Sequence, residues 1–216
     1  MLALCACSSK DPGADPAKLK PVWKSMLRTF PSPGMKECEG SSIVGGATLT
    51  ATTFFTLAGQ TYDKSKPEYQ EYVNPAELDS PAARTLVDPK AGTSDKRRAA
   101  AELLAAPFFL VYYIDLVSVP MALEVKELKR GTVSGRAIKF DKQGQLQCVR
   151  VFHFRNDKAV SEAAIAKSDK ARIDPAVAAE LRADLRVEML RRIPALTLPQ
   201  PPLDQMDAKP PDNMGN

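Results

Sequence analysis

The part of the chain that most constrains its fold is a succession of strand-forming runs between residues 107 and 155. The first run, Phe108 to Ile114, is a continuous series of aromatic and aliphatic residues, which is typical of a central buried strand. Further runs follow closely at residues 121–128, 132–140 and 145–154, the last two joined by a turn at 141–144. Short connections join antiparallel neighbours, so the sequence predicts an antiparallel meander over about residues 108–155.

One helix is expected before this meander in the sequence and another after it. Asp15-Pro16 is a good helix start, and apolar residues then recur at spacings of three and four from Leu19 to Phe30. Asp174-Pro175 opens a second helix, with apolar residues four apart from Val177 to Ile193 and an end before Pro194. The fold class is therefore α+β, an antiparallel sheet with flanking N-terminal and C-terminal helices.

The region between these elements is less regular. Residues 40–59 are rich in β-branched residues, which favours strands, but their Ala and Leu spacing also permits a helix. Gly45-Gly46 within them is interpreted as a turn or a close backbone approach. Residues 60–92 indicate a long surface excursion with a short helix starting at Asn74-Pro75 or Ser80-Pro81. Ser94 or Asp95 is expected to cap a further helix that runs to Ala106.

Length and composition indicate one folded domain. The chain has 216 residues, of which 44% are hydrophobic and 26% charged, the ordinary balance of a globular protein. Its net charge of +4 is distributed over separated basic pairs mixed with acids. Nucleic-acid binding requires basic residues clustered on one face with aromatic residues between them, so we expect no nucleic-acid partner.

The N-terminus changes abruptly from apolar to polar. Residues 1–7 are uncharged and apolar, and a polar stretch containing Pro and Gly follows. Leu4-Cys5-Ala6-Cys7 resembles the lipobox of bacterial lipoproteins, in which a cysteine after two small residues becomes the lipidated first residue. Only six residues precede Cys7, fewer than a complete signal peptide needs, so we expect the recorded start to lie within a longer signal.

This resemblance implies a division of the chain and a location. Residues 1–6 would be the remnant of a signal peptide, 7–16 a tether, 17–198 the single α+β domain and 199–216 a flexible proline-rich tail. Lipid on Cys7 would anchor the protein to a membrane, and Ser8 implies the outer membrane, facing the periplasm, rather than the inner. The alternative is a cytoplasmic protein with a chance apolar start.

Cys38 and Cys148 remain once the lipobox cysteines are set aside. An even number of cysteines in an oxidising compartment could form a disulfide, which would close a loop of 110 residues. In the chain-entropy model, such a closure stabilises the fold by about 4 to 5 kcal/mol. The alternative is two unrelated thiols, with Cys148 buried among apolar neighbours.

Catalytic signals are weak. His153 is the only histidine, and as a general base it would need an acidic partner, for which Asp115 and Asp141 are the best candidates. The alternative is a structural role, as a half-buried strand histidine with a satisfied hydrogen bond. Asp115 is interpreted either as a paired structural carboxylate or as a site group with a raised pKa. No hydrolase motif, metal-ligand spacing or cofactor motif is present, so no metal and no cofactor are expected.

The sequence thus favours a non-enzymatic lipoprotein whose domain binds another envelope protein or organises the envelope. A second hypothesis is a carrier that holds an apolar ligand between the sheet and the C-terminal helix. A third is a hydrolase that uses His153.

Overall fold

The computed structural model describes eight parts of the chain, residues 13–30, 36–38, 45–62, 75–118, 121–124, 127–129, 131–155 and 175–195. The side chains of residues 121–129, 175–178 and 194–195 are not described. The lipobox, residues 7–12 of the tether and the proline-rich tail lie outside the described residues.

The main sheet has four strands in the order β1-β2-β5-β6. These strands are β1 (Ala47–Thr50), β2 (Phe108–Ser118), β5 (Thr132–Asp141) and β6 (Leu146–Arg155). The three long strands β2, β5 and β6 pair antiparallel, as the sequence predicts. The expectation of a wholly antiparallel sheet is wrong, because β1 pairs parallel with β2. Between β1 and β2 the chain passes through several helices, and such a crossover returns the next strand in the same direction.

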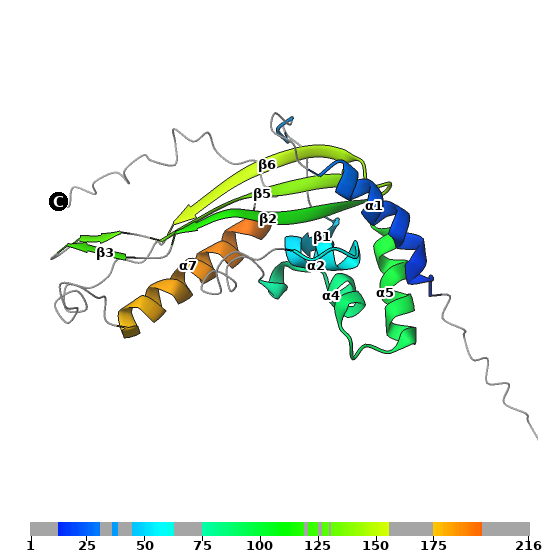
Figure 1. The fold of residues 1–216 in the computed structure, drawn as a ribbon, viewed down its shortest axis with the longest axis horizontal. Coiled ribbons are helices and arrows are strands. Elements are labelled where there is room, and N and C mark those ends of the chain that lie inside the picture. Colours follow the sequence, from blue (N-terminus) through cyan, green and yellow to red (C-terminus); the bar gives the residue numbers. More distant parts are fainter. Residues whose placement is uncertain are drawn as a thin grey trace, which may run out of the picture.

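The run at residues 121–128 does not form one strand of the main sheet. It contributes to a separate two-stranded sheet of β3 (Met121–Glu124) and β4 (Glu127–Lys129). Figure 1 shows this small ribbon beyond the left end of the long strands, between β2 and β5. The meander is therefore β2, β5 and β6, with the ribbon inserted in its first connection.

The ambiguous region around residue 50 contains both kinds of structure. β1 passes directly into α2 (Ala51–Leu57), and the hydroxyl of Thr50 accepts a hydrogen bond from the backbone N–H of Thr53 at 3.3 Å. Gly46 lies against Phe108, whose ring would be 2.1 Å from a Cβ placed on the glycine. The structure therefore has a close approach at Gly46 and a turn at Gly45, whose φ is +89°.

Several short helices surround this strand. The N-terminal helix is a 3-10 turn, η1 (Pro16–Leu19), followed by α1 (Lys20–Arg28), and Asp15 caps it by accepting from Ala17 N–H at 2.9 Å. A second 3-10 turn, η3 (Ala76–Leu78), precedes α4 (Pro81–Val87), which begins after Ser80. The next helix, α5 (Thr93–Ala105), has Gly92 as its N-cap and no side-chain cap, so it begins at least two residues earlier than the expected caps Ser94 or Asp95 predict. Asp95 forms an ion pair with Arg98 instead.

Two apolar layers pack on opposite faces of the sheet. The last helix, α7 (Pro175–Ala195), buries Leu181, Leu185, Met189 and Ile193, as its spacing predicts, although it continues through Pro194. These residues pack against one set of strand residues, which includes Phe152. The alternate set, which includes Phe109, packs against α1, α2 and α5. Figure 1 shows α7 below the left part of the sheet and the other helices gathered at its right.

The described helices on the Phe109 side gather at one end, so none of them covers the other end of that sheet face. Trp23 of α1, 3% exposed, packs edge-on against Phe109 with ring centroids 5.1 Å apart, so the apolar stripe of α1 faces the core.

Among the described residues, no helix is both long enough and apolar enough to cross a bilayer.

Candidate functional site

The end of the sheet that the described helices leave uncovered presents both polar and apolar side chains, and we call this surface the open face. Its side chains come from the same face of β2, β5 and β6. Its residues are Asp115, Leu116, Ser134, Arg136, Val151 and His153. Leu116 of β2 is 62% exposed and Val151 of the edge strand β6 is 66% exposed, so this surface presents large apolar side chains to solvent. The cross-strand register places Leu116 opposite Ser134, and Ser134 opposite His153.

Asp115 lies at an irregularity in β2, where the pairing with β5 shifts between Ile114 and Leu116. Its carboxylate accepts two hydrogen bonds from the guanidinium of Arg136, from Nε at 2.9 Å and from an NH2 group at 2.5 Å. The same guanidinium lies 5.1 Å from the centre of the Tyr113 ring. Asp115 is thus engaged in a bidentate ion pair on the sheet surface.

His153 contacts a serine rather than an acid. Its Nδ1 lies 2.7 Å from the hydroxyl oxygen of Ser134 on the neighbouring strand. Asp141, the other expected acidic partner, accepts hydrogen bonds from Gln143 and Gln145 N–H in the turn between β5 and β6. Among the described residues, the imidazole of His153 therefore has no hydrogen bond to Asp115 or to Asp141.

The Ser134 and His153 pair has the composition of a nucleophile and its base, but not the surroundings. Ser134 lies in the middle of β5, between β2 and β6, where backbone N–H groups are used by the sheet. An acyl-transfer site needs free N–H groups directed at the developing oxyanion. We expect the wild type and His153→Ala to hydrolyse simple esters equally, at the background rate. An esterase activity of the wild type that His153→Ala loses would support the hydrolase hypothesis instead.

The disulfide connects a separate segment to the edge of the sheet. Cys38 and Cys148 are joined with an S–S distance of 2.06 Å and are both buried. Next to this bond, Cys38 N–H donates to the carbonyl of Val149 at 3.1 Å, and Val149 N–H donates to the carbonyl of Lys36 at 3.0 Å. We call residues 36–38 the strap, because they pair in parallel with β6 at a single bridge, Glu37 to Val149.

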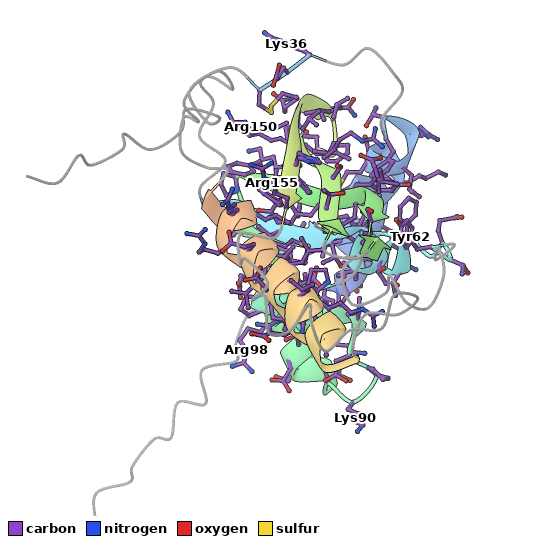
Figure 2. All side chains as sticks on the ribbon, turned by 90° about the vertical axis from the view of Figure 1, so that its left-hand side faces the viewer. Lys36, Tyr62, Lys90, Arg98, Arg150 and Arg155 are labelled. Atoms are coloured by element: carbon purple, nitrogen blue, oxygen red, sulfur yellow. A yellow bond between two sulfur atoms is a disulfide. The ribbon has the colours of Figure 1, made fainter. Side chains whose placement is uncertain are left out.

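Basic side chains gather around the strap. Arg150 donates to the carbonyl of Cys38 at 3.0 Å, which adds a third hydrogen bond between the strap and β6. The strand β6 contains Arg150 and Arg155 and no Asp or Glu. Figure 2 shows Lys36, Arg150 and Arg155 in the upper part of the molecule, while Lys90 lies at the bottom.

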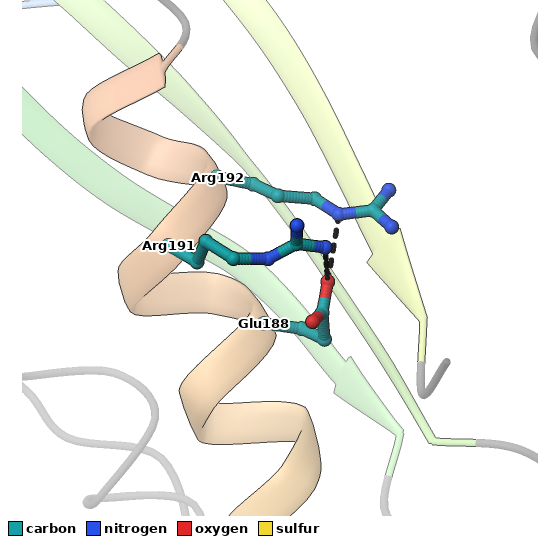
Figure 3. Close-up of polar contacts among 3 residues, drawn as sticks. All are labelled: Glu188, Arg191 and Arg192. Carbon is teal, nitrogen blue, oxygen red and sulfur yellow. Dashed lines mark hydrogen bonds and ion pairs between the residues drawn. The ribbon is translucent and has the colours of Figure 1, made fainter. Parts of the chain in front are cut away.

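A second charged cluster lies on α7 and was not predicted from the sequence. The carboxylate of Glu188 accepts hydrogen bonds from Arg191 at 2.6 Å and from Arg192 at 2.8 Å. Figure 3 shows both guanidinium groups converging on one oxygen atom of the carboxylate. The hydrogen bond from Arg191, with that from Arg192, lowers the pKa of Glu188 below its ordinary value, although burial opposes this. The signal was the spacing of three and four residues, which places these side chains on one helix face.

The remaining site predictions lie elsewhere. Cys7, the expected lipidation site, lies outside the described residues. Within the described part of the chain, no three His, Cys, Asp or Glu side chains lie close enough together to hold a metal ion. Comparison of the chain with protein-family models, with curated proteins and with solved structures finds no match.

Proposed function

We propose that this chain is a lipid-anchored protein of the bacterial cell envelope whose domain binds another envelope protein and is not an enzyme. The observation that carries the proposal is the Cys38–Cys148 disulfide. Structural disulfides belong mainly to exported proteins, because cytosolic thiols are kept reduced. A cytoplasmic protein would gain no stability from this bond.

The lipobox-like Leu4-Cys5-Ala6-Cys7 supports the same location independently. Lipid on Cys7 anchors the domain, and Ser8 favours the outer membrane, with the domain in the periplasm. Two or more acyl chains hold a protein firmly on a bilayer, whereas one chain binds only marginally. The domain therefore needs no membrane-spanning segment to stay in the envelope.

Binding, rather than carriage of an apolar ligand, is favoured by the packing under the sheet. Leu185, Met189 and Ile193 of α7 are fully buried against the strands. Opposite them, the ring of Phe152 lies where a side chain on Gly135 would be, 2.6 Å from the position of a Cβ. These described side chains pack closely where the carrier hypothesis needs a cavity, whereas Leu116 and Val151 of the open face are exposed.

The test is the covalent state of the protein expressed from its native gene. We expect membrane-fractionated protein to begin at a lipid-modified Cys7 in mass spectrometry of its N-terminal peptide. Thiol labelling under denaturing conditions should leave Cys38 and Cys148 unmodified until a reductant is added. The matched control is Cys7→Ala, which should abolish the lipid and release the protein from the membrane fraction.

An unmodified N-terminus in the soluble cytoplasmic fraction, with both thiols freely labelled, would refute the anchor and the location together. A lipidated Cys7 with reduced Cys38 and Cys148 would keep the anchor and remove the observation on which the oxidising location rests.

A further inference from the structure

We propose that the outer edge of β6, from Val151 to Arg155, is a docking site at which an extended acidic segment of a partner protein adds a strand to the sheet. This inference deepens the proposed binding function and rests on it. It names the surface, the mode of recognition and the chemistry of the partner.

The orientation of the backbone follows from Val149. Both its N–H and its carbonyl point outward, because they bond to the strap and not to β5. Successive residues of a strand direct these groups to alternate sides. The pairing of β5 with β6 runs without a shift from Lys139 opposite Cys148 to Thr132 opposite Arg155. The N–H and carbonyl groups of Val151, His153 and Arg155 therefore also point outward.

These three residues are exposed, and their outward backbone groups have no hydrogen-bond partner within the described residues. Among the residues that the structure describes, only the strap pairs with this edge, at Val149. Natural proteins usually cover, shorten or bend a free strand edge, because unpaired N–H and carbonyl groups accept another strand. An edge whose last three outward-facing residues have no backbone partner among the described residues is suited to strand addition.

The strap shows how a strand sits at this edge. It lies parallel to β6 and makes two backbone hydrogen bonds to a single residue. The disulfide and the hydrogen bond from Arg150 fix it, so it is part of the folded domain. A partner strand in the same direction would continue the line of the strap along Val151, His153 and Arg155.

The charged side chains of β6 indicate which kind of partner segment this edge would bind. Both charged side chains of β6, Arg150 and Arg155, are basic. Arg155 is exposed and has no ion pair among the described residues. Opposite charges across a strand pair stabilise it, and like charges destabilise it. The partner segment should therefore carry Asp or Glu, with an aliphatic residue beside the exposed Val151.

The test uses the full, oxidised chain and a short capped peptide that alternates glutamate with threonine and valine. In the free protein, the amides of Val151, His153 and Arg155 should exchange with solvent faster than those of Phe152 and Phe154, which face β5. On titration with the peptide, exchange at the three edge amides should slow and their NMR signals should shift. The same peptide with lysine in place of glutamate should bind about tenfold more weakly, a difference of roughly 1.4 kcal/mol.

Two variants locate the binding. Val151→Pro removes an outward N–H without removing a hydrogen bond to β5, and it should weaken peptide binding about tenfold, a change of roughly 1.4 kcal/mol. Val151→Thr, which keeps that N–H, is its control. Arg155→Glu should reverse the charge preference between the two peptides. Lys90→Glu makes the same charge change at a distant exposed site and should have no effect.

Several outcomes overturn the proposal. Slow exchange at all three edge amides in the dilute free protein would mean that the edge is already covered. Protection that increases with protein concentration, without peptide, would identify a second copy as the occupant instead. Equal binding of both peptides would remove the acidic partner. None of these results depends on lipidation, so a failure here leaves the envelope location intact, and the fractionation experiment decides that separately.

Discussion

Asp79 is a buried carboxylate that joins the end of β1 to the start of α2. It is 5% exposed, and it accepts hydrogen bonds from Thr50 N–H at 2.5 Å and from the Thr53 hydroxyl at 2.7 Å. Burial nevertheless raises its pKa above the ordinary value of 3.8, because removal from water disfavours the charged form more than these donors favour it. The sequence offered no sign of this, since the contact depends on how η3 packs against β1.

The raised pKa of Asp79 predicts a stability that decreases as pH rises. The folded protein keeps the proton to a higher pH than the unfolded chain, so the free energy of unfolding falls between pH 3.8 and the raised folded pKa, and is level above it. Asp79→Asn cannot titrate. We expect wild-type stability, measured relative to this variant by urea unfolding, to decline over that window. A difference that is constant or that increases with pH would contradict the assignment.

Glu188 predicts the opposite dependence. Its pKa is lowered from 4.5, first by the hydrogen bond from Arg191, so its contribution is present above pH 4.5 and is lost as pH falls through the folded pKa. Arg191 is 61% exposed and therefore screened by water, and we expect Glu188→Gln to cost about 0.5 to 1 kcal/mol at neutral pH. The same urea series should show this cost vanish in acid. A cost that persists at the lowest pH would indicate a packing role instead.

At the scale of elements, the sequence predicted helices better than sheet topology. Capping residues such as Asp15 and the apolar spacing of α7 are local signals, and both helices form where expected. The direction of β1 is not local, because it depends on the helices that intervene before β2. The open face could not be predicted either. Alternation with a period of two places Val151 on one face of a strand, but it does not tell whether a helix covers that face.

The close packing of the central strands predicts a strong effect at Gly135. A Cβ there would lie 2.4 Å from the carbonyl oxygen of Tyr113 and 2.6 Å from the ring of Phe152, and the first of these is backbone that cannot yield easily. We expect Gly135→Ala to destabilise the domain by about 2 to 3 kcal/mol, measured by thermal or urea unfolding. The neighbouring Ser134→Ala, on the half-exposed opposite side, should cost no more than about 0.5 kcal/mol. Equal effects would mean that the strands can separate to admit a methyl group.

At the scale of the whole molecule, the disulfide links distant parts of the chain. The loop from Cys38 to Cys148, with a sequence separation of 110, includes β1, the intervening helices, β2 and β5. The strap therefore follows α1 in sequence but is held at the far edge of the sheet, next to β6. Spacing alone allowed this pairing but could not require it, because loop length says nothing about whether two cysteines meet in the fold.

This long closure predicts a large loss of stability on reduction. In the chain-entropy model, it stabilises the fold by about 4 to 5 kcal/mol, mainly by restricting the unfolded chain. The comparison needs a Cys5→Ala, Cys7→Ala background, so that only Cys38 and Cys148 can react. Oxidised protein should unfold at clearly higher urea than reduced protein or the additional Cys38→Ala, Cys148→Ala variant. Amide exchange at Cys38 and Val149 should accelerate in the reduced form, because the strap loses its covalent link, while exchange at Phe152 should change only with global stability. If reduction leaves the unfolding midpoint unchanged but accelerates exchange at Cys38 and Val149, the bond holds only the strap, and the domain owes its stability to the two apolar layers alone.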